Sequence, residues 1–284
     1  MLEKKIAFIG SGEMAEAMIA GMLRKKLARP ENLLASGPRI ERGVQLKEKY
    51  GLQPFTDNNT AVPTADLVVL SVKPQRLSGV LAGLKNVSPQ AFVLSIVAGA
   101  PIQKIAAALK NAAVVRAMPN TPAQIGEGIT VWAAAAEVSN EQKEIARSIL
   151  GALGEEIFVE DENYLDMATA LSGTGPTYVF MFMEAMIDAG VHMGFSRRVS
   201  EQLVVQTLKG SVGYYQTINE KTDVHVAALR NQVTSPGGTS AEALYYLEKA
   251  GFRTAISRAI WAAYQRSLEL GKETPIHLPE TGKE

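Results

Sequence analysis

One short stretch near the amino terminus limits the folds open to this chain more than any other. Residues 6–9, Ile-Ala-Phe-Ile, form an apolar run that ends at Gly10; Gly12 follows, and the small residue Ala15 stands where a third glycine is common. The methionines after the turn recur at every fourth position, as in a helix that buries one face: Met14, Met18 and Met22. The stretch is therefore typical of a buried strand, a tight turn and a helix start.

This glycine pattern, in this context, predicts a dinucleotide-binding site. Gly10 permits the turn, Gly12 lets a pyrophosphate approach the backbone, and Ala15 lets the helix pack close to the strand. The start of the helix then offers N–H groups and a positive dipole end to the phosphates. The alternative is an ordinary turn between a strand and a helix that binds nothing.

Apolar segments and helical patterns alternate over the first half of the chain. The expected strands after the first are 33–35, 66–72, 92–97, 113–116, 128–133 and 156–159, with residues 51–63 as a polar connection. Runs that are apolar at every position are typical of parallel strands buried on both faces. We therefore expect an α/β fold in which residues 1–162 form a doubly wound, Rossmann-like parallel sheet.

The second half of the chain reads as helical. Helices are expected at 177–192, 196–217, 241–250 and 252–270, with a polar loop at 219–222 and a short helix capped by Asp223. The first of them is apolar on most sides, which favours burial against a partner subunit. We expect an all-α dimerisation and substrate domain over residues 163–271, followed by a mobile tail at 272–284.

The end of the second expected strand indicates which cofactor is bound. A unit that binds NAD usually carries Asp or Glu there, to hold the ribose 2′-hydroxyl. This chain has Ser36, Gly37, Pro38 and Arg39 instead. A hydroxyl and a guanidinium suit a 2′-phosphate, so the sequence favours NADPH, with NADH as the alternative. The next strands end at Lys73-Pro74 and Ala98-Gly99, where open α/β sheets bind ligands.

Composition excludes several classes of protein. The chain has no cysteine and three scattered histidines, so we expect neither disulfides nor a metal site. Lys+Arg and Asp+Glu balance at 29 each without a basic run, which argues against nucleic acid as a partner. No stretch approaches the ~18 apolar residues of a membrane span, and the charged start does not look like a secretion signal. We expect a cytoplasmic enzyme with a small-molecule substrate and no membrane partner.

Residues 235–240, Ser-Pro-Gly-Gly-Thr-Ser, are the most informative polar segment of the helical half. They place hydroxyls and two glycines at the start of a helix, where successive N–H groups can bind an anion. A small carboxylate would suit such a site. A plain helix cap is the alternative, for which one hydroxyl would be enough.

Four segments together resemble the pyrroline-5-carboxylate reductase family. They are Val72-Lys73-Pro74-Gln75, Arg116 to Pro122, Leu171 to Tyr178, and Val233 to Ser240. Their order and spacing match that family up to about residue 270. The resemblance implies reduction of 1-pyrroline-5-carboxylate to L-proline by NAD(P)H, the last step of proline synthesis. It also implies a homodimer through the helical domain, which can form part of a larger ring.

The resemblance also assigns residues to the site. The cofactor contacts it implies, together with those predicted above, are Gly10, Ser11, Gly12, Glu13, Met14, Ser36, Arg39, Asn58, Val72, Lys73, Pro74, Ala98 and Gly99. The substrate would lie on Gly237, Gly238, Thr239 and Ser240, with Glu162 near it. Family members usually carry Thr where this chain has Ser240.

We expect the hydroxyls of Ser240 and Thr239 to serve the chemistry, with Ser240 bonded to the imine nitrogen. A β-hydroxyacid dehydrogenase is a rival interpretation, but its catalytic lysine has no counterpart before Lys209 after the glycines at 173–175. A regulatory protein that binds NADPH without turnover is the other alternative.

Overall fold

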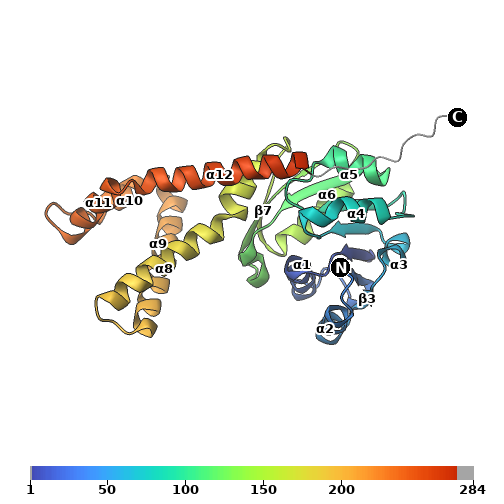
Figure 1. The fold of residues 1–284 in the computed structure, drawn as a ribbon, viewed down its shortest axis with the longest axis horizontal. Coiled ribbons are helices and arrows are strands. Elements are labelled where there is room, and N and C mark those ends of the chain that lie inside the picture. Colours follow the sequence, from blue (N-terminus) through green and yellow to red (C-terminus); the bar gives the residue numbers. More distant parts are fainter. Residues whose placement is uncertain (1, 274–284) are drawn as a thin grey trace. The chain divides into compact units, whose positions relative to one another are not determined.

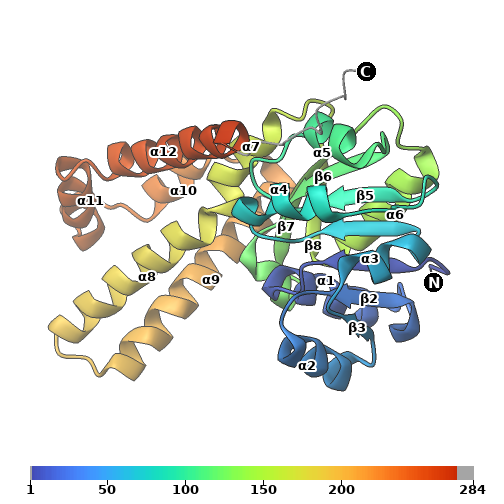
Figure 2. The ribbon, with the colours of Figure 1, turned by 45° about the vertical axis from the view of Figure 1, so that its right-hand side comes forward.

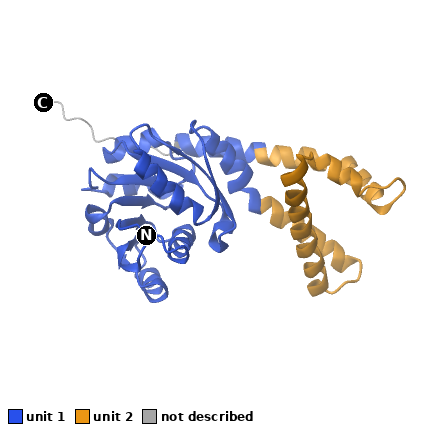
Figure 3. Ribbon diagram, turned by 180° about the vertical axis from the view of Figure 1, so that it is seen from behind, with its two compact units in different colours: residues 1–176, 261–284 blue, residues 177–260 orange. Residues whose placement is uncertain are grey.

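The structure, a computed structural model, describes residues 2–273, which fall into two compact units (Figure 3). Unit 1 contains the chain up to Pro176 and the chain from Trp261 onward, and unit 2 contains Thr177–Ile260. The predicted tail at 272–284 falls largely outside the described residues, and its first two positions belong to the last helix, α12 (Phe252–Glu273).

The centre of unit 1 is an eight-stranded sheet in the order β3-β2-β1-β4-β5-β6-β7-β8. Most neighbouring strands are parallel, which confirms the predicted fold class, but β7 runs antiparallel to β6. Only a short connection with a single 3-10 turn joins these two strands, and it is too short for the crossover that a parallel pair needs. The strands are β1 (Ile6–Ile9), β2 (Leu33–Ser36), β3 (Gln53–Phe55), β4 (Leu67–Leu70), β5 (Phe92–Ser95), β6 (Val114–Met118), β7 (Gly128–Ala134) and β8 (Gly154–Phe158).

Helices cover both faces of this sheet, as a doubly wound fold requires (Figure 2). One face packs on α1 (Glu13–Arg24), α2 (Ile40–Tyr50) and α6 (Asn140–Gly151), and the other on α3 (Asn58–Ala61), α4 (Pro74–Gly83) and α5 (Ile102–Leu109). Alternate residues of β1 face the two layers, so Phe8 belongs to one core cluster and Ile9 to the other. Both side chains are fully buried.

The expectation of a plain polar connection over residues 51–63 is wrong. The segment forms the edge strand β3 and the short helix α3, which Asp57 caps by accepting a hydrogen bond from the Asn59 N–H. An edge strand of three residues, with Gln53 exposed and Pro54 and Phe55 half-buried, has no apolar run by which the sequence could reveal it.

After β8, the chain continues as a series of helices whose type changes from α to π and back to α. The helix α7 (Tyr164–Ala168) leads into a π-helical turn at Thr169–Gly173 and then into α8 (Gly175–His192). The Asn120 amide bridges this turn to the sheet, because its Nδ2 donates to the Ser172 carbonyl oxygen at 3.2 Å and its Oδ1 accepts from the Ile129 N–H at 3.0 Å.

Unit 2 is helical, as predicted (Figure 1). It holds most of α8, together with α9 (Arg197–Thr222), α10 (Val226–Gln232), α11 (Thr239–Lys249) and the first part of α12. The expected loop at 219–222 is wrong, since α9 continues through it. Asp223 ends α9 in a left-handed conformation, and the residue that caps α10 is His225. A polar segment of this kind can continue a long amphipathic helix, because the exposed face of such a helix is polar in any case.

The helix α8 presents large apolar side chains on the surface of the isolated chain. Phe180 is 60% exposed and Met181 72% exposed, whereas a helix of a lone globular chain usually hides such residues. Within residues 2–273, no helix combines the length and the apolar character needed to cross a membrane.

Candidate functional site

The turn after β1 is shaped by a glycine that the fold requires. Gly10 has a φ of +102°, and a Cβ there would lie 2.7 Å from the Ser71 carbonyl oxygen. The Ser71 hydroxyl in turn donates to the Gly10 carbonyl oxygen at 2.8 Å, which joins the end of β4 to the turn. The predicted role of Gly10 as a turn residue thus has a physical basis, because a side chain would be both strained and blocked.

Gly12 is the residue that precedes α1, and the space in front of it is open. Among the described residues, no heavy atom lies within 4 Å of a Cβ built on Gly12 apart from its own neighbours in the chain. Glu13 and Met14 begin the helix, with Glu13 exposed and Met14 packed partly against the core. The first turn of α1 therefore meets open space, the arrangement that lets phosphates approach a helix N-terminus.

The predicted cofactor residues after β2 and β4 lie beside this turn. A Cβ on Gly37 would lie 2.5 Å from the Ser11 hydroxyl, so the chain after β2 touches the glycine turn directly. The buried Ser36 donates from Oγ to Asn58 Oδ1 at 2.7 Å, which brings these two predicted residues together. Val72 lies against the turn, since its Cγ1 would be 2.8 Å from a Cβ on Gly10. Lys73 and Pro74 follow at the start of α4.

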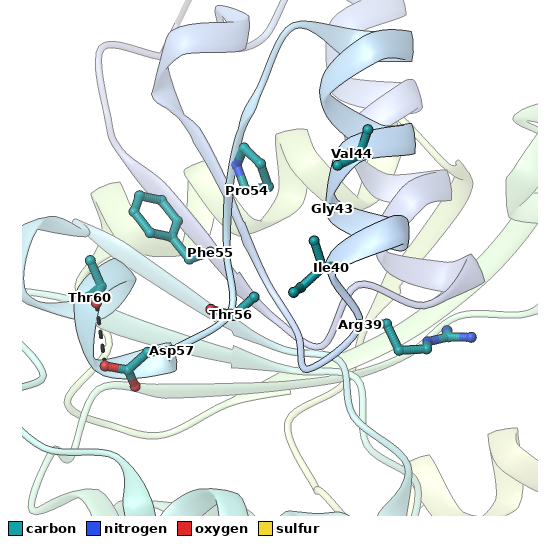
Figure 4. Close-up of a pocket in the computed structure, with 9 residues that line it drawn as sticks. All are labelled: Arg39, Ile40, Gly43, Val44, Pro54, Phe55, Thr56, Asp57 and Thr60. Carbon is teal, nitrogen blue, oxygen red and sulfur yellow. Dashed lines mark hydrogen bonds between the residues drawn. The ribbon is translucent and has the colours of Figure 1, made fainter.

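A pocket of about 300 Å³ lies between α2 and the segment that contains β3 and the start of α3 (Figure 4). Ile40 and Val44 from the helix, with Pro54 and Phe55 from the strand, give it apolar walls. Arg39 stands at its rim and is exposed, and Figure 4 shows its side chain extending away from the apolar wall. The complete lining is Arg39, Ile40, Gly43, Val44, Pro54, Phe55, Thr56, Asp57 and Thr60.

A network of charged side chains that sequence reasoning missed braces the glycine turn. Arg42 on α2 donates from Nε to the Ser11 carbonyl oxygen at 3.0 Å, and its guanidinium pairs with Glu16 on α1. Lys49 Nζ and the Tyr50 hydroxyl each donate to Glu16 Oε1 at 2.8 Å. The network joins two helices that are distant in sequence, so no spacing within either helix could have revealed it.

These donors change the acidity of Glu16. Burial by itself would raise the pKa of the carboxyl, but hydrogen bonds from Lys49, Tyr50 and Arg42 outweigh burial and lower the pKa from 4.5 to about 2. Conversely, the bond to Glu16 raises the pKa of the Lys49 ammonium. The carboxylate is therefore charged at neutral pH and balances the Arg42 guanidinium.

Ala98 and Gly99 follow β5, the neighbour of β4 in the sheet, and form a turn before α5. A Cβ on Gly99 would lie 2.9 Å from the Leu270 Cβ, so the end of α12 packs directly on this turn. Glu162 reaches the same region: its Oε1 accepts from the Ile102 N–H at 2.8 Å and from Arg116 at 2.9 Å. The structure thus places Glu162 in contact with other residues of unit 1, partly exposed.

The segment predicted to bind a carboxylate belongs to unit 2. Gly237 has a φ of +70°, Gly238 precedes α11, and the helix begins with Thr239 and Ser240, both exposed in the isolated chain. The predicted anion site is therefore a glycine turn at a helix start. Among residues 2–273, no group of three His, Cys, Asp or Glu side chains is arranged to hold a metal ion.

Two family models match the chain and divide it between them. Residues 5–99 match the NADP oxidoreductase, coenzyme F420-dependent family, and residues 162–270 match the pyrroline-5-carboxylate reductase dimerisation family. The first match covers β1 to the turn after β5, where the predicted cofactor residues lie. The second covers α7 to most of α12 and includes the glycine turn before α11.

Similarity to known proteins extends over nearly the whole chain. Pyrroline-5-carboxylate reductase of Synechocystis is 39% identical over 95% of this chain and 99% of its own, and the Pseudomonas aeruginosa enzyme is 38% identical over 96% and 99%. The crystal structure of Plasmodium falciparum pyrroline carboxylate reductase with NADP bound superposes with a TM-score of 0.86, at 34% identity over 95% of this chain and 99% of that one. This chain therefore belongs to the pyrroline-5-carboxylate reductase family.

Proposed function

We propose that this protein reduces 1-pyrroline-5-carboxylate to L-proline with NADPH. The observation that carries the proposal is the 39% identity to a pyrroline-5-carboxylate reductase over almost the full length of both chains. The glycine turn supports the same function, since the open space in front of Gly12 leaves room for phosphates at the start of α1. In the reaction, the imine, NADPH and a proton give proline and NADP⁺.

The residues present fit NADPH. The open space in front of Gly12 leaves room for a pyrophosphate at the start of α1. The apolar pocket beside α2 would take the adenine, and the Asp57 carboxylate in its wall is already bonded to the start of α3. Arg39, exposed at the pocket rim, offers a guanidinium to a 2′-phosphate that a carboxylate would repel. Ser36 is buried with its hydroxyl donated to Asn58, so these two residues would contribute by holding the end of β2 against the start of α3.

The remaining cofactor contacts follow from the direction of the sheet. With the adenosine half over β2 and the pyrophosphate at β1, the other half extends over β4 and β5. Val72, Lys73 and Pro74, and then Ala98 and Gly99, stand at those strand ends. NADPH would supply the hydride there, and these turns would hold its reacting end in place.

The glycine turn before α11 holds the substrate. Gly238 shapes the turn, with its own N–H donated to the Ser235 carbonyl oxygen at 3.1 Å. The N–H groups of Gly237, Thr239 and Ser240 bind the carboxylate of the imine, and Thr239 and Ser240 supply hydroxyls. The Ser240 hydroxyl bonds the ring nitrogen and orients it as it takes up a proton. Glu162 is the acidic residue that the family places near the substrate.

We also propose the domain roles and the assembly. Residues 1–162 form the cofactor domain, and residues 163–271 form the helical domain through which two copies pair as a homodimer. The exposed apolar side chains of α8 support such pairing, because Phe180 and Met181 would otherwise remain in water. The protein acts in the cytoplasm on a small molecule, with neither nucleic acid nor membrane as a partner.

The test is an assay of NADPH oxidation with purified protein and 1-pyrroline-5-carboxylate, with proline measured as the product. We expect one proline for each NADPH consumed, and no oxidation when the imine is left out. Tight binding of NADPH without turnover would instead support the regulatory alternative. Oxidation with β-hydroxyacid or keto-acid pairs, but not with the imine, would support the dehydrogenase alternative.

A further inference from the structure

A buried arginine stands at the centre of unit 1 and has no part in the function proposed above. Arg116 lies on β6 and is 3% exposed. It donates from one terminal nitrogen to Glu162 Oε1 at 2.9 Å and from the other to Asp166 Oδ1 at 3.2 Å. A guanidinium removed from water needs such partners, so the positions of Arg116, Glu162 and Asp166 depend on one another.

The first of these carboxylates holds the start of α5. The residue before that helix is Pro101, whose side chain has no atom able to accept a hydrogen bond. Glu162, 60 positions further along the chain, accepts the Ile102 N–H at 2.8 Å in its place. A carboxylate at this position is also favoured by the positive end of the helix dipole. Glu162 therefore sets where α5 begins, and with it the turn of Ala98 and Gly99, which only Ala100 and Pro101 separate from the helix.

The second carboxylate reaches the helix that packs on the other side of the same turn. Asp166 Oδ1 accepts from the Ser267 hydroxyl on α12 at 2.6 Å. Four residues later, the backbone of Gly271 lies against Gly99, with its nitrogen 2.9 Å from a Cβ built there. Lys104 on α5 donates to the Gly271 carbonyl oxygen at 3.3 Å. The turn is thus held on one side through Glu162 and on the other through Asp166.

We propose that Arg116 is a positioning residue for the reduction. Through Glu162 and Asp166 it fixes the turn of Ala98 and Gly99 at the end of β5, where the reacting half of the cofactor lies. The inference rests on the proposed function, because it takes this turn as part of the NADPH site. It also gives Glu162 a role that needs no contact with the substrate, since its Oε1 is shared between Arg116 and the Ile102 N–H.

The position of the turn determines which kinetic constant responds. The adenosine and pyrophosphate contacts lie at β1 and β2, and the Arg116 network does not touch them. A displaced turn leaves NADPH bound but sets its reacting end at the wrong distance from the imine. Loss of the network therefore lowers kcat more than it weakens NADPH binding, and it makes the transfer step slower relative to product release.

The experiment uses the full-length enzyme with Arg116→Lys, Arg116→Met and Glu162→Gln. Lysine keeps the charge but cannot serve both carboxylates in the same geometry, and glutamine keeps an acceptor oxygen without the charge. The readouts are kcat, KM for each substrate, NADPH affinity by fluorescence titration, and the isotope effect on kcat with NADPH deuterated at the transferred position. Arg147→Met is the matched control, because Arg147 also pairs with two carboxylates, Glu144 and Glu156, on α6 and β8.

We expect Arg116→Met to lower kcat by about 10- to 100-fold while NADPH affinity changes by less than about threefold, with a larger isotope effect than the native enzyme shows. The kcat and the isotope effect of Arg116→Lys and Glu162→Gln should lie between those of the native enzyme and those of Arg116→Met. Arg147→Met should leave both quantities unchanged. If Arg116→Met does not fold, the other two variants decide the question.

Folded variants with native kcat and native isotope effect would overturn the proposal. So would a Glu162→Gln variant with only a raised KM for the imine, which would indicate direct substrate contact. A native enzyme that does not oxidise NADPH with the imine would refute the proposed function instead.

Discussion

Arg42 Nε donates a hydrogen bond to the carbonyl oxygen of Ser11, 3.0 Å away. The bond joins α2, which forms one wall of the pocket beside β3, to the glycine turn at the start of α1. The two parts of the proposed NADPH site are thus fixed to each other by one side chain. Glu16 holds the guanidinium in place, so Arg42 braces the site and its charge is already balanced.

Replacing Arg42 by glutamine should raise KM for NADPH about tenfold and leave kcat nearly unchanged. Tenfold corresponds to ~1.4 kcal/mol, within the usual net contribution of one hydrogen bond. Steady-state kinetics at saturating imine measure both constants. Lys47→Gln, which removes an exposed positive charge from the same helix, is the control and should behave as the native enzyme. An unchanged KM for NADPH in the Arg42 variant would show that α2 does not position the turn.

Arg39 should determine the preference for NADPH over NADH. Because it stands exposed at the pocket rim, Arg39→Gln should lower kcat/KM for NADPH by about 10- to 100-fold, the loss of one hydrogen bond to a charged group. The same variant assayed with NADH is the control. Its kcat/KM for NADH should stay native, since NADH has no 2′-phosphate for Arg39 to contact. Equal losses with both cofactors would mean that Arg39 serves the adenosine generally and not the phosphate.

Alanine at Gly10 and alanine at Gly12 should have different effects. At Gly10, a Cβ would meet the Ser71 carbonyl oxygen at 2.7 Å on a backbone with φ of +102°, so Gly10→Ala should destabilise the protein by about 2 kcal/mol or more. At Gly12, the space that a Cβ would enter is open, so Gly12→Ala should melt at the native temperature but bind NADPH at least about tenfold more weakly. Thermal melts with and without NADPH separate the two effects. A Gly12→Ala variant with native affinity would mean that no phosphate lies against that residue.

Glu16 should make stability depend on pH in the acid range. The pKa of its carboxyl is about 2 in the folded protein and 4.5 when unperturbed. A depressed folded pKa means that the unfolded chain binds the proton first, so the stabilisation is complete above pH 4.5 and is lost as the pH falls toward 2. Glu16→Gln should therefore be less stable than the native protein by about 1–2 kcal/mol at pH 7 and lose less stability on acidification. Urea unfolding at several pH values measures the free energy of unfolding of both proteins. Parallel curves of this free energy against pH would contradict the prediction.

Ser240 should matter through its hydroxyl. Ser240→Ala is expected to lower kcat/KM for the imine by about 10- to 100-fold, the loss of one hydrogen bond to a group that becomes charged. Ser240→Thr keeps the hydroxyl and restricts its rotamer, so it should retain most of the rate. NADPH affinity should be native in both variants, because Ser240 serves the imine in this proposal. Full activity in Ser240→Ala would remove the residue from the mechanism.

The sequence by itself determined the fold class and the cofactor. Continuous apolar runs such as residues 6–9 can be buried only as central strands, and Gly10 with Gly12 directly after one of them leaves little besides a nucleotide turn. The absence of a carboxylate after residue 36 indicated NADPH on charge alone. These inferences succeed because each depends on residues that are neighbours in the chain.

Only the tertiary structure decided how distant residues combine. The edge strand at 53–55 and the antiparallel direction of β7 depend on neighbours and connection lengths, and no periodicity encodes them. The contacts of Arg42 with Ser11, and of Arg116 with Glu162 and Asp166, join elements far apart in sequence. In the sequence, charged side chains such as these look like solvated surface residues. The fold removes one of them, Arg116, from water, so its guanidinium needs partners inside the protein.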